Sequence, residues 1–166
     1  MTPSKNIKEE IYEEALRLEK GILYSEESNF ILANYWNYAN TLLGVSIITF
    51  SVVSGGFAFT DFTDFNILIG VLTIFITAIS MIQIFLNPHE KSSFNHNTGT
   101  RYSKLRSELR IFYNSELDMN SDDENIKRLK KFNDEKNRID IESTNLPGFI
   151  YNKAKKNIEK KEYDYL

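Results

Sequence analysis

Two long stretches of this chain contain apolar and small side chains at nearly every position. No Asp, Glu, Lys or Arg occurs in residues 28–60 or in residues 65–89. A helix of about 21 residues spans about 31 Å, which matches the hydrocarbon core of a bilayer. We therefore predict two transmembrane helices, at roughly residues 39–59 and 66–86.

The alternative is that both stretches are core helices of a soluble protein. Such helices need other apolar surface to cover them on every side, and the flanking segments are too polar to supply it. The link at residues 60–65 is also too short for anything but an antiparallel turn. A helical hairpin through the bilayer is the interpretation that we favour.

Charge and aromatic residues near the ends of the hairpin predict its orientation. The link contains Asp61 and Asp64 but no basic residue, whereas lysine and arginine occur before the first span and after the second. Basic residues favour the cytoplasmic side, and Trp36 with its neighbouring tyrosines suits the headgroup level. We expect both termini to be cytoplasmic and the protein to be a multi-pass protein of a bacterial inner membrane.

The remaining sequence has helical periodicity. Ile7, Ile11, Ala15, Leu18 and Ile22 share one face of a helix over residues 6–34, which can continue directly into the first span.

Three more helices are expected beyond the second span. They cover residues 91–117, a helix capped by Ser121 with Glu124, and residues 148–161. Pro88 is expected to end or kink the second span. The fold class is all-α, with a cytoplasmic amphipathic helix (1–38), a transmembrane hairpin (39–88) and a cytoplasmic C-terminal helical bundle (89–166).

Small and weakly polar residues recur at alternating spacings of three and four in both spans, which places them on one face of each helix. This face either packs against another helix, within the hairpin or between copies, or lines a polar path in an oligomer. Gln83 is the most polar side chain deep in the second span, and it either bonds to the neighbouring helix or faces a lumen. The candidate helix-packing or pore-lining residues are Thr41, Gly44, Ser51, Gly55, Gly70, Thr73, Thr77, Ser80 and Gln83.

The last predicted helix is rich in lysine. Such a cluster either rests on anionic lipid or is a solvated helix face. The lysines are Lys153, Lys155, Lys156, Lys160 and Lys161.

The sequence offers little material for catalysis. It has no cysteine, only two histidines (His89 and His96), and no phosphate-loop, dinucleotide or zinc-protease motif. Neither span contains an ionisable residue for a proton relay or voltage sensor. The net charge of −3 does not favour direct binding of nucleic acid. We expect no enzyme, no cofactor and no metal site.

The order of these parts resembles the SLATT domain family, bacterial two-transmembrane proteins that accompany nucleotide-sensing systems. The resemblance covers nearly the whole chain. Its motifs are soft: Tyr35-Trp36, the exit Phe85-Leu86-Asn87-Pro88, then His96, Gly99, Tyr102 and Leu105, and the turn Leu146-Pro147-Gly148-Phe149.

The resemblance implies an effector of antiphage defence that opens pores in, or disrupts, the inner membrane when infection is sensed. Its implied partners are the lipid bilayer, further copies of itself, and a nucleotide-sensing or nucleotide-synthesising protein or the diffusible product of that protein. The alternative is a membrane-anchored interaction module that docks a sensor or scaffold and forms no pore.

Overall fold

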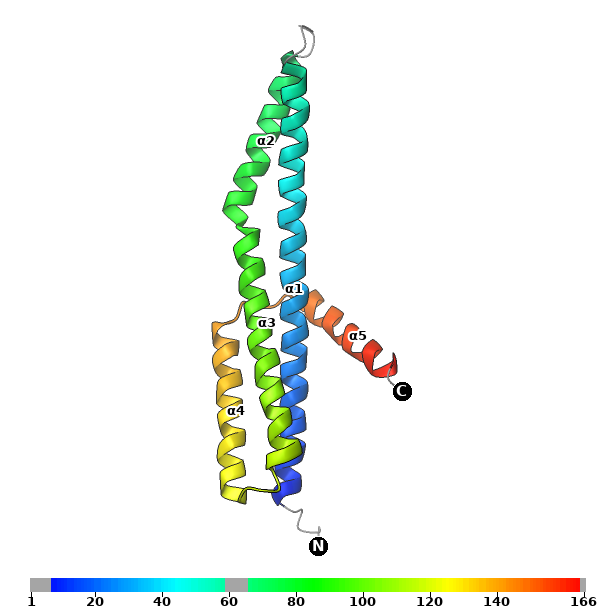
Figure 1. Cartoon of the computed structure of the whole chain (residues 1–166). Helices are drawn as coiled ribbons and strands as arrows, with labels where there is room; N and C mark the ends of the chain where they lie inside the picture. Colours follow the sequence, from blue (N-terminus) through cyan, green and yellow to red (C-terminus); the bar gives the residue numbers. More distant parts are fainter. Residues whose placement is uncertain (1–6, 59–65, 165–166) are drawn as a thin grey trace. The chain divides into compact units, whose positions relative to one another are not determined.

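The computed structural model describes residues 7–58 and 66–164, and every regular element in them is helical (Figure 1). The all-α prediction is therefore confirmed for the described residues. The elements are α1 (Ile7–Ala58), α2 (Asn66–Leu86), α3 (Pro88–Ile111), the π-helical turn η2 (Phe112–Glu116), α4 (Asp122–Glu142) and α5 (Gly148–Asp164).

The first predicted helix continues into the first predicted span, as the sequence allowed. α1 is one uninterrupted helix of 52 residues, without proline. α2 has the same bounds as the second predicted span, residues 66–86. The predicted outer loop at 60–65, with its two aspartates, lies outside the described residues.

Contacts divide the chain into two compact units, with α1 and α3 each contributing to both. Unit 1 comprises Met1–Leu32 and Phe94–Leu166, and unit 2 comprises Ala33–Ser93. The sequence had placed the corresponding boundaries at residues 38 and 89. Helix periodicity does not change at either boundary, so the sequence gives no local signal for them.

The hydrophobic core of unit 1 is formed by α1, α3 and α4. Buried side chains from these helices and from η2 form one cluster, and half-buried Leu18, Tyr113, Leu129 and Phe132 pack against it. The predicted apolar face of the first helix supplies Ile11, Ala15 and Ile22 to this cluster. Its other buried members are Tyr102, Leu105, Leu109, Phe112, Leu117 and Ile139.

Local sequence explains where these helices begin. The Ser121 side chain accepts a hydrogen bond from the Glu124 backbone N–H at 3.4 Å, which confirms the predicted helix cap. Asn87 has φ 43° between α2 and α3, a left-handed conformation that asparagine tolerates better than most residues. Pro88 follows as the first residue of α3, where its missing N–H is no loss.

Candidate functional site on the apolar helices

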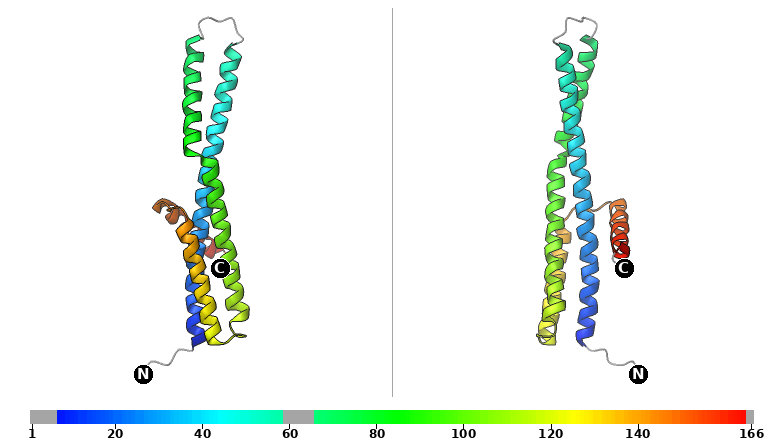
Figure 2. Two further views of the ribbon diagram at one scale, coloured as in Figure 1. Left: turned by 90° about the vertical axis from the view of Figure 1, so that its left-hand side faces the viewer. Right: turned by 45° about the vertical axis from the view of Figure 1, so that its right-hand side comes forward.

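In unit 2, α2 runs antiparallel to the C-terminal part of α1 (Figure 2). Half-buried residues recur on each helix at spacings of three and four, and the positions between them are mostly exposed. These two rows are the faces that the helices turn toward each other, and we call them the seam. It contains Asn40, Leu43, Ile47, Phe50 and Ser54 of α1 and Ile69, Leu72, Ile76, Ile79, Gln83 and Leu86 of α2.

Gln83 belongs to this seam. Its side-chain amide donates a hydrogen bond to Asn40 Oδ1 at 3.2 Å, joining α2 to α1. Of the two sequence-based alternatives for Gln83, the structure therefore has the bond between helices. Such a bond satisfies a polar group that would be costly to leave unpaired in an apolar environment.

The predicted small residues occupy a different face from the seam. In both helices each candidate directly follows a seam position, so it lies about 100° further round the helix. Because the two helices are antiparallel, the same rotation on each brings both rows to one side of the pair. We call this side the small-residue face. It contains Thr41, Gly44, Ser51, Gly55, Gly70, Thr73, Thr77 and Ser80.

The glycines of the small-residue face have no close neighbour among the described residues. A Cβ built at Gly44, Gly55 or Gly70 meets no atom within 4 Å. Close packing of the two helices within one chain therefore does not account for these glycines. Contact with another copy, or with lipid or water, remains open.

The hydroxyl groups of this face are satisfied inside their own helices. Thr41, Thr73, Thr77 and Ser80 each donate to the backbone carbonyl four residues earlier, at 2.8–3.0 Å. A hydroxyl with its proton committed in this way can sit in lipid at low cost. The same hydroxyl still has an oxygen that can accept a hydrogen bond from a neighbouring helix or from water.

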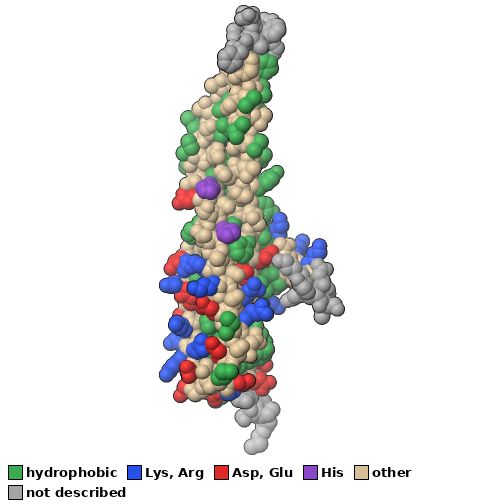
Figure 3. Space-filling model, viewed as in Figure 1, with side chains coloured by type: hydrophobic (Ala, Val, Ile, Leu, Met, Phe, Trp, Pro, Cys, Tyr) green, Lys and Arg blue, Asp and Glu red, His purple; other side chains and the backbone are tan. Residues whose placement is uncertain are grey.

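Large apolar side chains are exposed on the other sides of both helices. The exposed fraction is 69% at Val52, 82% at Ile67, 70% at Ile74 and 87% at Phe85. Charged side chains gather over the α3, α4 and α5 surfaces of unit 1, while α2 presents none (Figure 3). Two helices of the described chain are long and apolar enough to cross a membrane.

A polar tie that the sequence did not predict joins the charged end of the pair. The Lys91 ammonium lies 4.5 Å from the centroid of the Trp36 ring, and the Ser92 hydroxyl donates to the Ala33 carbonyl at 2.9 Å. The signal available beforehand was a tryptophan and a lysine at the expected headgroup level, without information on which helix faces meet. A cation over an indole is stabilising, more so where water is scarce.

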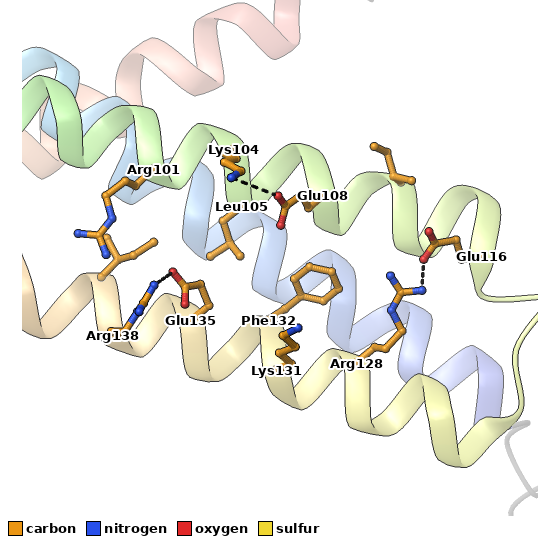
Figure 4. A pocket seen from close by; sticks show the side chains of 12 residues that line it. Arg101, Lys104, Leu105, Glu108, Glu116, Arg128, Lys131, Phe132, Glu135 and Arg138 are labelled. Carbon is orange, nitrogen blue, oxygen red and sulfur yellow. Dashed lines mark hydrogen bonds and ion pairs between the residues drawn. The ribbon is translucent and has the colours of Figure 1, made fainter.

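Unit 1 has a groove between α3 and α4 of about 640 Å³ (Figure 4). Five basic side chains line it, but carboxylates neutralise most of them: Arg128 pairs with Glu116, Arg138 with Glu135 at 2.6 Å, and Lys104 with Glu108 at 3.9 Å. The groove is therefore a surface lined by paired charges and offers no clear excess of charge to a ligand.

Two phenols of unit 1 bond to carboxylates. The Tyr102 hydroxyl donates to Asp140 Oδ1 at 2.5 Å and the Tyr113 hydroxyl donates to Glu19 Oε2 at 2.8 Å. Burial raises the pKa of Tyr102 well above its usual value of about 10, and the adjacent Asp140 adds to the effect. Burial and Glu19 raise the pKa of Tyr113 in the same way. Both groups tie helices together as neutral phenols.

The two histidines are exposed and do not converge on other ligating groups. His96 packs edge-on against Phe30, with ring centroids 5.4 Å apart. Among the described residues no group of three or more His, Asp or Glu side chains is arranged to hold a metal ion.

These observations define the class to which the chain belongs: an all-helical protein with two helices long and apolar enough to cross a membrane. Comparison with known proteins finds no matching family model, no matching curated protein and no matching solved structure.

Proposed function

We propose that the chain is a homo-oligomeric effector in the bacterial inner membrane, inserted as a two-transmembrane hairpin with both termini cytoplasmic. Its cytoplasmic bundle receives a trigger, and the hairpins then permeabilise the membrane as part of antiphage defence. The observation that carries the proposal is the surface of unit 2, where bulky apolar side chains cover the outside and the small residues share one face.

Membrane insertion follows from the cost of exposing that surface to water. Burial of apolar area is worth about 25 cal/mol per Å². Residues such as Ile67, Ile84 and Phe85 are 79–87% exposed, and nothing else in the described chain covers them. Lipid covers such side chains without requiring any further protein, which makes the bilayer the most economical solvent for unit 2.

Oligomerisation is supported by the small-residue face. In lipid, helices associate where small residues let their backbones approach closely. Gly44 and Gly70 leave open space in the isolated chain, and a second copy can fill it. One hairpin cannot enclose a pore, so permeabilisation requires several copies.

The defence role comes from the resemblance to SLATT domains. The trigger would then be a nucleotide-sensing or nucleotide-synthesising partner or its diffusible product, acting on unit 1.

The oligomer is tested by particle mass in mild detergent, where the monomer is 19.4 kDa. Gly44→Leu combined with Gly70→Leu should shift the protein toward monomer, because the added side chains meet no neighbour inside the chain and can obstruct only contacts outside it. Gly56→Leu is the matched control, since it also meets no atom within 4 Å but lies off the small-residue face. Unchanged mass of the double variant, or equal loss in the control, rejects this interface.

Permeabilisation is tested by membrane depolarisation in cells that express the chain with its activating system. The parent should depolarise the membrane, and the double glycine variant should not. Persistent absence of depolarisation and of ion leak rejects the pore.

A membrane-anchored interaction module is the second candidate. It is favoured by the internal hydrogen bonds of Thr73, Thr77 and Ser80, which leave no hydroxyl proton for a water path. Exchange of residues 39–88 for an unrelated hairpin separates the two functions: an anchored module keeps its activity and a pore-former loses it.

A further inference from the structure

One exposed face of α5 combines an aromatic ring with three lysines. Phe149, Lys153, Lys156 and Lys160 follow one another at spacings of four, three and four, so they share a stripe along the helix. All four side chains are exposed, Phe149 to 62%. Basic residues with an aromatic ring are typical of helices that lie on membrane surfaces.

The opposite side of α5 is held on the protein. Ile150, Ala154 and Ile158 are buried, at 0–5% exposure. Two contacts connect α5 to α1: the Tyr151 ring lies 5.7 Å from the Tyr24 ring, and the Asn157 amide donates to Glu27 Oε1 at 3.0 Å. The buried side lies roughly 130° round the helix from the lysine stripe, so the stripe points away from α1.

The charge of this stripe is not neutralised by the described residues. Lys156 and Lys160 form no ion pair with any of them, and the one nearby carboxylate, Glu159, pairs with Lys155 at 3.8 Å. The stripe therefore offers positive charge to an outside partner.

The attachment point of α5 on α1 is also where the charges of α1 end. Glu27 is the last charged residue before the uncharged stretch, and Trp36 follows nine positions later on the same continuous helix. Nine residues correspond to about 14 Å along a helix. With Trp36 at the headgroup level, flexible lysine side chains on α5 come within about a Debye length, 8 Å, of the lipid surface.

We propose that the Phe149–Lys160 stripe of α5 binds the anionic headgroups of the cytoplasmic leaflet. The proposal rests on the proposed membrane insertion of α1 and α2. Each lysine near an anionic surface contributes about 1 kcal/mol, which is about fivefold in the binding equilibrium. Loss of Lys156 and Lys160 together should therefore weaken the surface-bound state of α5 by about 30-fold.

The absence of cysteine from the chain allows clean reporters of position. A fluorophore on Asn152→Cys, an exposed α5 position beside the stripe, reports on the headgroups through quenching by lipids with a nitroxide headgroup. The full chain is reconstituted in vesicles of phosphatidylcholine alone or with added phosphatidylglycerol. A second reporter, on Ile74→Cys of α2, reports on the bilayer interior through acyl-chain nitroxides.

We expect quenching at position 152 only in vesicles that contain phosphatidylglycerol, and we expect salt and the pair Lys156→Glu and Lys160→Glu to abolish it. The matched control is Lys127→Glu with Lys130→Glu, two exposed lysines of α4 at the same net charge, which should leave quenching unchanged.

Quenching that ignores lipid charge, or that falls equally in the α4 control, overturns the proposal. The same holds if added RNA binds the stripe in neutral vesicles while anionic lipid produces no quenching. Quenching at position 74 without quenching at position 152 rejects the α5 contact alone. Absence of quenching at position 74 rejects membrane insertion itself.

Discussion

Replacement of Tyr102 with phenylalanine should loosen unit 1 without changing its shape. Tyr102 is 1% exposed, and its hydroxyl bonds to Asp140 at 2.5 Å, connecting α3 to α4. A hydrogen bond to a charged group is worth about 1.5–3 kcal/mol. Because Asp140 is partly exposed and also pairs with Lys136 at 2.6 Å, the lower end of that range, about 1.5 kcal/mol, is expected.

Hydrogen exchange by mass spectrometry measures this loss locally. In detergent at neutral pH, α4 amides of Tyr102→Phe should exchange about tenfold faster than those of the parent, the factor that corresponds to about 1.4 kcal/mol. Tyr151→Phe is the matched control, since Tyr151 is 48% exposed and its ring contact with Tyr24 survives the change. Unaltered exchange in α4 would show that the bond to Asp140 contributes nothing to stability.

The same bond makes the stability of unit 1 dependent on alkaline pH. Because the folded state raises the pKa of Tyr102, its contribution is complete below the usual phenol pKa of about 10 and is lost as pH rises from there toward the folded value. Helix content followed by circular dichroism should therefore fall above pH 10 in the parent. The fall should be shallower in Tyr102→Phe, and equal slopes would refute this assignment.

Three further substitutions test local packing. Gly21→Ala should stabilise unit 1 by about 1 kcal/mol through helix propensity, whereas Gly99→Ala should give no such gain because its Cβ meets the Phe30 ring at 3.0 Å; thermal unfolding compares them, and an equal gain from both refutes the contact. Ser121→Ala should cost about 1 kcal/mol by removing the cap of α4, visible as faster exchange at its first turn. Asn87→Gly should be tolerated and Asn87→Val should destabilise the α2–α3 junction, because φ 43° is strained for a β-branched residue; equal melting temperatures would contradict this.

The sequence predicted the helices well because their signals are local. The cap at Ser121, the proline at position 88 and the amphipathic face of Ile11, Ala15 and Ile22 each depend on residues a few positions apart. The described helices follow these signals closely.

The seam between α1 and α2 could not be predicted in the same way. Periodicity reveals a buried face only where polar residues mark the other face. In α2 nearly every position is apolar, so Ile69, Leu72 and Ile76 look no different from Ile74 or Phe75. The small residues attracted notice because they differ in type, yet they lie beside the seam and not within it.

Buried polar residues were a second blind spot. Asn125 is fully buried, and its amide donates to the Leu117 carbonyl at 2.9 Å, where the chain turns after η2. An asparagine after three acidic residues is typical of a solvated first turn. Only the three-dimensional path of the chain brings the Leu117 carbonyl to it.

The central claim is that lipid is the solvent of the two uncharged helical segments. Its most direct test is the collision rate of a nitroxide on Ile74→Cys with oxygen and with a water-soluble nickel complex, compared with a nitroxide on exposed Ser107→Cys of α3. Oxygen concentrates in lipid, so position 74 should collide mainly with oxygen and position 107 mainly with nickel. If nickel reaches position 74 as readily as position 107, or if neither reagent reaches it, the segments do not face lipid and the account is wrong.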